Sequence, residues 1–148
     1  MIPGVSGRLI ANAFLEEQVL PRLLGSADAE AAAVLARHLG RWWSRVTAAL
    51  GPASSARAVF DVALAPLLNA LAHPQPGMSA HDWGCTGVVH ESGRAVAAVM
   101  AVPWDTALDA AWRRAVRAGL DAGAPWAILA NGRSLRLVDC ARPWARFH

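Results

Sequence analysis

The feature that most constrains the fold is a change in hydrophobic periodicity across residues 73–77, which read HPQPG. Before this segment, apolar residues recur every three or four positions, as in amphipathic helices; after it, they form short runs typical of strands. Two prolines and a glycine within five residues indicate a linker. The sequence therefore predicts an α+β fold, with a helical lobe over residues 1–73 and a sheet-containing core over 74–148. We expect the two parts to form one structural domain, because 148 residues can bury a core without disulfides.

Three helices are predicted in the lobe. The first is expected to end near Arg22. The second, over residues 27–50, has the clearest apolar stripe and stops at Gly51-Pro52. The third, over residues 55–71, contains Pro66, which is expected to kink or divide the helix because proline lacks the backbone N–H.

The core is predicted to begin with two strands and a helix. Residues 83–90 have an extended pattern, and Ser92-Gly93 forms a turn into the uninterrupted apolar run AVAAVMAV at 95–102. Such a run is typical of a central strand that is covered on both faces. The helix that follows is expected to start at a capping box made by Thr106 and Asp109 and to end at Gly123.

The remaining core is predicted to be a hairpin, with strands over 126–130 and 133–139 joined by Asn131-Gly132 as a two-residue turn. The predicted order is therefore β-β-α-β-β. We expect Trp112, Leu120 and Trp126 to lie on buried faces. Three arginines fall outside the apolar stripe of the helix and are expected to be exposed: Arg113, Arg114 and Arg117.

The segment from Gly123 to Asp139, GAPWAILANGRSLRLVD, resembles the W-x-x-L-T-N-G-x-x-W-x-L-Y/V-D hairpin of type IIG restriction-modification enzymes and related nuclease domains of type I systems. In that family the hairpin follows a helix, and the helix follows a strand that carries the ExK of a PD-(D/E)xK nuclease. The run GRAVAAVMAV over residues 93–102 aligns with that strand without a gap. The resemblance covers residues 80–148 well and 55–72 more loosely. It implies a restriction-endonuclease-like core.

The resemblance also implies that most of the catalytic residues are lost. Asp82 falls near the metal-binding aspartate of the family, whereas Met100 replaces the glutamate and Val102 replaces the lysine. In an active enzyme the carboxylates hold Mg²⁺, which activates water, and the lysine positions the nucleophile. The thioether of Met100 cannot hold Mg²⁺, which is a hard cation, and the isopropyl group of Val102 cannot position a nucleophile.

Some active nucleases carry a catalytic residue at a neighbouring position instead of the usual one. All fourteen basic residues are arginines, so no lysine exists to take over the lost position. If residues 82–91 form one strand, Asp82 and Glu91 are roughly 30 Å apart and cannot share a metal. Asp105 is better interpreted as a helix N-cap. We therefore expect no metal site, and a need for Mg²⁺ only if the chain is an active nuclease with rearranged ligands.

Basic residues are unevenly distributed, with eight arginines against four acids over residues 94–148. If duplex DNA binds, phosphate contacts are expected from Arg113, Arg117, Arg136 and Arg142. A solubilising surface explains the same charge equally well. The sequence therefore leaves both readings of these arginines open.

The preferred functional hypothesis is a catalytically degenerate nuclease-like domain that binds DNA or acts as a scaffold in a restriction-modification or phage-defence assembly. A methyltransferase or specificity subunit would then be its partner, in one polypeptide or in a split system. The alternatives are a protein-interaction module without DNA affinity and an active nuclease. No secretory signal or membrane span is recognised, so a cytoplasmic location is expected. Both cysteines are expected to be buried and reduced.

Overall fold

The structure is a computed structural model that describes residues 12–19, 21–22, 29–74 and 76–141. It shows the predicted α+β fold, in which a helical region precedes a five-stranded mixed sheet. The chain divides into two compact units, residues 1–38 and 39–148, and the boundary falls inside a helix rather than at the linker 73–77.

The first unit contains α1 (Asn12–Phe14), the π-helical turn η1 (Leu15–Val19) and the beginning of α3 (Ala29–Ala49). Helix α3 confirms the long amphipathic helix predicted over 27–50. Its last three turns belong to the second unit, where Val46 and the following Leu50 are buried in the core.

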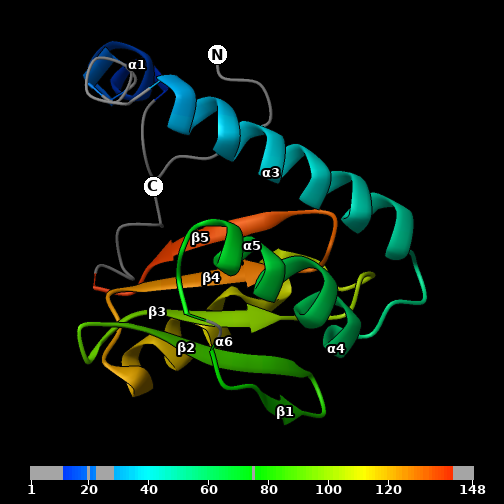
Figure 1. Ribbon diagram of the computed structural model, residues 1–148. Helices are drawn as coiled ribbons and strands as arrows, with labels where there is room; N and C mark the ends of the chain where they lie inside the picture. The colour runs from blue at the N-terminus through cyan, green and yellow to red at the C-terminus, as the bar shows by residue number, and fades with distance from the viewer. Residues whose placement is uncertain (1–11, 20, 23–28, 75, 142–148) are drawn as a thin grey trace. The chain divides into compact units, whose positions relative to one another are not determined.

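The second unit is built on the sheet, whose strand order is β1-β2-β3-β4-β5. The strands are β1 (Ser79–His81), β2 (Gly84–Glu91), β3 (Arg94–Ala101), β4 (Trp126–Ala130) and β5 (Leu135–Asp139). Neighbouring strands are antiparallel except β3 and β4, which are parallel and joined by α6 (Leu108–Ala122). Helix α6 covers one face, and the helices between residues 56 and 70 cover the other (Figure 1). The short strand β1 was not predicted.

The predicted third helix is divided into α4 (Ala56–Val59), the π-helical segment η2 (Phe60–Leu64) and α5 (Ala65–Ala70). Because Pro66 has no N–H to donate to the carbonyl four residues earlier, the backbone widens just before it, and the N–H of Ala65 donates to the carbonyl of Phe60. The prediction of a division is confirmed.

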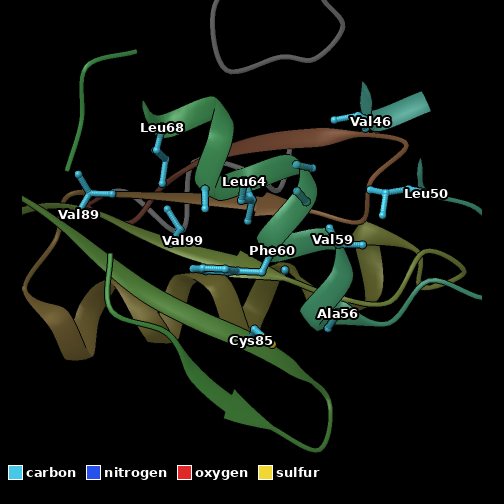
Figure 2. Close-up of a cluster of buried hydrophobic side chains, with 14 residues drawn as sticks. Val46, Leu50, Ala56, Val59, Phe60, Leu64, Leu68, Cys85, Val89 and Val99 are labelled. Atoms are coloured by element: carbon cyan, nitrogen blue, oxygen red, sulfur yellow. The ribbon is translucent and has the colours of Figure 1, made fainter. Parts of the chain in front are cut away.

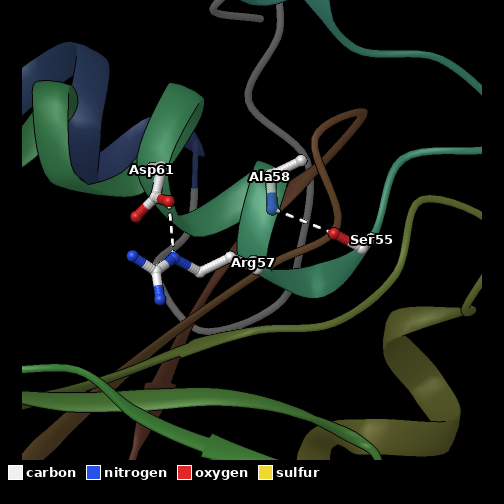
Figure 3. Close-up of polar contacts among 4 residues, drawn as sticks. All are labelled: Ser55, Arg57, Ala58 and Asp61. Atoms are coloured by element: carbon white, nitrogen blue, oxygen red, sulfur yellow. Dashed lines mark hydrogen bonds and ion pairs between the residues drawn. The ribbon is translucent and has the colours of Figure 1, made fainter.

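Polar side chains stabilise the start of this divided helix (Figure 3). Ser55 accepts a hydrogen bond from the N–H of Ala58 as an N-cap, at 3.2 Å. One turn later, the guanidinium of Arg57 donates to the carboxylate of Asp61 at 2.5 Å. This hydrogen bond, with the attraction between the two charges, raises the pKa of Arg57. Both side chains are solvent-exposed, so the pair adds little to stability.

The larger buried cluster lies between the divided helix and the sheet (Figure 2). Phe60, Leu64 and Leu68 point from the helix towards Val89 of β2 and Val99 of β3. The end of α3 joins the cluster through its buried residues, and the indole N–H of its half-buried Trp42 donates to a carbonyl of η2 at 2.8 Å.

A second cluster fills the space between α6 and the opposite face of the sheet. Alternate residues of β3 therefore enter different clusters: Val99 and Ala101 face the divided helix, whereas Met100 and the following Val102 face α6. Strand β3 lies third of five and is covered on both faces at these positions, which confirms the prediction of a central strand.

Helix α6 packs closely on the end of β5 at Gly119. A Cβ added to this buried glycine would overlap Sγ of Cys140 and lie 3.1 Å from its Cβ. We expect Gly119→Ala to destabilise the fold by about 1–3 kcal/mol, because Cys140 is itself buried and cannot easily move away. In a Cys140→Ala background the cost should be smaller, because the overlap with Sγ is gone and alanine favours a helix over glycine by about 1 kcal/mol, although the Cβ of residue 140 still lies 3.1 Å away. Urea unfolding of the four chains measures this coupling, and equal costs in both backgrounds would contradict the close packing.

The predicted start of α6 is wrong. The helix begins at Leu108, and its N-cap Ala107 makes no side-chain capping bond. Thr106 lies before the helix, where its carbonyl accepts a hydrogen bond from the side-chain amide of Asn131 at 2.9 Å. Asp109 instead pairs with Arg136 of β5 at 2.6 Å. Asp105, predicted as an N-cap, is an exposed turn residue two positions too early for that role.

The predicted two-residue turn at Asn131-Gly132 is also wrong, because four residues separate β4 from β5. Asn131 is almost fully buried and opens the loop by accepting hydrogen bonds from the N–H groups of Arg133 and Ser134. Gly132 adopts a φ of 85°, and a Cβ there would lie 2.9 Å from the ring of Trp104. The Asn-Gly pair therefore has a structural role in this loop.

Two apolar residues predicted to be buried are exposed. Leu120 is 56% exposed on α6, and Trp126 is 37% exposed on the face of β4 opposite α6. The divided helix covers that face over β2 and β3 but leaves Trp126 accessible. Trp112 is half-buried against the second cluster. As predicted, Arg113, Arg114 and Arg117 are exposed.

Candidate functional site

From the resemblance, catalytic residues are expected at the carboxyl end of β3. Asp82 is in the two-residue turn between β1 and β2 and is exposed. Gly84, two residues later, packs against this end of β3, since a Cβ on it would lie 3.6 Å from Cγ1 of Val102. The fold thus brings the Asp82 turn to the end of the strand that carries Met100 and Val102.

Met100 and Val102 are not available to a ligand. Their exposed fractions are 1% and 0%, and both belong to the apolar cluster beneath α6. Leu108 and Ala111 of α6 are in the same cluster, and Trp83 packs against it. The space around both residues is therefore filled by core side chains.

The structure does not bring Glu91 to Asp82 as a substitute carboxylate. It corrects the assumption that residues 82–91 form one strand, because β2 starts at Gly84. Glu91 ends β2, so an eight-residue strand, roughly 26 Å long, still separates it from Asp82. Within the described part of the chain, no cluster of three or more histidine, cysteine or acidic side chains could hold a metal ion.

An aromatic and cationic stack flanks the Asp82 turn, and sequence reasoning missed it. The rings of His81 and Trp83 are stacked with centroids 4.7 Å apart and planes 1° from parallel. The guanidinium of Arg114 from α6 lies 5.4 Å from the centroid of Trp83. His81 also bonds to the hydroxyl of Thr86 at 2.9 Å. Aromatic rings on either side of Asp82, at His81 and Trp83, were the only signal in the sequence.

The four arginines predicted to contact DNA have different surroundings. Arg117 binds Asp121 one turn along α6 at 2.9 Å, and Arg136 binds Asp109. Arg113 lies over the ring of Trp112 and is exposed. Arg142 lies outside the described residues. Two carboxylates thus offset much of the positive charge on this face, which weakens its attraction for phosphates.

The two thiols are buried and unpaired with each other, as predicted. Burial raises the pKa of the Cys85 thiol, although the charge of Arg57 opposes the shift. The thiol therefore stays protonated at neutral pH and is a poor nucleophile.

A small apolar pocket of about 50 Å³ opens between the end of α3, α5 and the β4–β5 loop. Trp42, Trp43, Leu67 and Leu135 form much of its wall, with Arg133 at the same opening. Trp43 is 48% exposed. The apolar walls can take up an apolar side chain but offer little for chemistry.

Comparisons with known proteins add no functional assignment. A scan against protein-family models finds no match, and searches of curated proteins and of solved structures find none. None of the described helices combines the length and apolar character needed to cross a bilayer.

Proposed function

We propose that this chain is a restriction-endonuclease-like domain that has lost its catalytic residues and binds DNA within a restriction-modification or phage-defence assembly. The observation that carries the proposal is the burial of Met100 and Val102 in the core, at the positions where the family resemblance requires the ExK glutamate and lysine. Side chains with no access to solvent cannot bind Mg²⁺ or orient a nucleophile.

The order of elements supports the nuclease-like part of the proposal. Strand β3, helix α6 and the hairpin β4–β5 follow one another as the resemblance requires. The parallel pairing of β3 with β4 places the hairpin next to the strand with the degenerate motif. The family motif Asn131-Gly132 maintains the loop at the start of this hairpin.

Without catalysis, the domain would hold a DNA duplex while a methyltransferase or specificity subunit acts on it. Arginine side chains would contact phosphates, which position a duplex without reading its sequence. Such an assembly belongs in the cytoplasm, and the domain itself requires no cofactor.

The test is fluorescence anisotropy of a labelled duplex titrated with the purified chain at several salt concentrations in the presence of Mg²⁺, followed by a gel of the product. We expect binding that weakens steeply with salt, because counterions are released from DNA, and an uncut duplex. Cleavage that disappears in Asp82→Ala would overturn the proposal in favour of an active nuclease.

The second candidate is a protein-interaction module, favoured by an exposed apolar surface on β4 and β5. Trp126, Leu135 and Leu137 lie on one face of the sheet, and Leu135 is 49% exposed. Apolar side chains gathered in this way are typical of protein contacts. In the same experiment, absence of DNA binding even at low salt, together with salt-insensitive self-association, would favour this function.

A further inference from the structure

Helix α3 carries a row of arginines that the sequence-based prediction of DNA contacts did not include. Arg41 and Arg45 are four residues apart and therefore lie on the same side of the helix, and Arg37 precedes them by one more turn. All three are exposed. After Glu30, α3 contains no acidic residue.

These arginines keep their positive charge uncompensated. Among the described residues, neither Arg41 nor Arg45 forms an ion pair, whereas Arg57, Arg117 and Arg136 each bind a carboxylate. Opposite charges within a few ångströms of one another largely cancel at longer range. On α6, Arg113 and Arg114 also form no ion pair among the described residues, but that helix carries Asp109 and Asp121 beside its arginines. The side of α3 that carries Arg41 and Arg45 has no carboxylate on the same stretch of helix.

The core holds this helix so that the row faces solvent. Val46 and Leu50 are buried on the other side of α3, and the indole N–H of Trp42 donates to the carbonyl of Ala63. A basic amphipathic helix that binds a membrane needs its apolar face for the lipid. Because the apolar face of the last turns of α3 already packs in the protein core through Val46, the geometry there favours a soluble polyanion over a membrane surface.

We propose that Arg41 and Arg45 form the principal contact of this chain with the phosphate backbone of duplex DNA. The inference rests on the proposed function and names the surface that performs it. Along α3 the two arginines are about 6 Å apart, at 1.5 Å per residue. One strand of a duplex presents about one phosphate per 3.4 Å along its axis, so the pair matches roughly two to three consecutive phosphates.

The experiment compares three double variants of the full chain, each of which removes two positive charges. Arg41→Gln with Arg45→Gln removes the row, and Arg113→Gln with Arg117→Gln removes two arginines of α6. Arg57→Gln with Arg94→Gln is the control, because both side chains are exposed and lie outside either surface. Affinity for a labelled duplex is measured against salt concentration, and circular dichroism establishes that each variant is folded.

We expect the α3 variant to bind about tenfold more weakly at low salt, and the slope of log K against log salt to fall by about 2, at roughly 0.9 per lost phosphate contact. The other two variants should lose less than about threefold, the general effect of net charge. A loss in the α6 variant that equals or exceeds that of the α3 variant overturns the inference and leaves the proposed function intact.

Two further outcomes separate this inference from the proposed function. If the unmodified chain binds no duplex at low salt, the proposed function fails and the assignment of its contact surface fails with it. The unmodified chain is also mixed with vesicles of phosphatidylcholine and phosphatidylserine, to which we expect no binding. Binding to the vesicles that depends on Arg41 and Arg45, without binding to the duplex, would assign the row to a membrane surface instead.

Discussion

Introducing the glutamate and lysine of the ExK motif with Met100→Glu and Val102→Lys is expected to unfold the protein rather than to create a nuclease. Both positions are sealed in the cluster between β3 and α6, with exposed fractions of 1% and 0%. An ionised side chain placed there loses its hydration, at a cost of several kcal/mol for each charge. Attraction between the two new charges recovers only part of this cost, because the cluster offers them no polar partner.

The expected loss, above about 5 kcal/mol, is comparable with the total stability of a typical domain. Circular dichroism should therefore show little cooperative unfolding, and the variant should aggregate during purification. Met100→Leu with Val102→Ile is the matched control, since apolar replacements of similar volume usually cost less than about 1.5 kcal/mol each. A soluble double variant that cleaves DNA in the presence of Mg²⁺ would show that this end of β3 is an accessible catalytic site.

The sequence predicts the elements of this fold better than their ends. The long apolar run that became β3 and the amphipathic pattern of α3 were identified because each repeats its signal over many residues. Strand β1 has only three exposed residues and carries no such signal. It exists because it pairs with β2, a contact that a local pattern does not record.

The errors in the loops have a common cause. Thr106 and Asn131 each have side chains suited to a local role, as a helix cap and as a tight turn. In the structure they interact across 25 positions of the sequence, since the amide of Asn131 binds the carbonyl of Thr106. A long-range hydrogen bond of this kind competes with the local ones, and the sequence contains no sign of which will form.

The candidate site was only partly accessible to sequence reasoning. The resemblance places Met100 and Val102 at catalytic positions, and the structure shows that both side chains are buried. The sequence-based prediction of DNA contacts rests on the number of arginines in the C-terminal third. The attraction of an arginine for phosphate also depends on whether a carboxylate is paired with it. Asp109 reaches Arg136 only through the packing of α6 on β5, which the sequence does not record. Arg41 and Arg45 lie outside the segment that is richest in arginine, and no acidic residue accompanies them on the same stretch of α3.

Phe60→Ala is expected to destabilise the second unit by about 3–5 kcal/mol, the range for removing a buried aromatic ring. Phe60 is 1% exposed and points into the centre of the larger cluster (Figure 2). It also starts the π-helical segment, whose wider turn sets the direction of its side chain towards the sheet. The cavity cannot collapse easily, because Pro66 restrains the helix and Val99 lies on the central strand.

Urea unfolding followed by tryptophan fluorescence measures this loss. Phe60→Leu fills most of the same volume and should cost roughly 1–2 kcal/mol. Leu71→Ala is a control outside the cluster, because this leucine is 41% exposed and its truncation should change stability by less than about 1 kcal/mol. If Phe60→Ala costs no more than Leu71→Ala, the divided helix does not pack on the sheet as described. The two faces of β3 would then differ, with only the α6 side forming a core.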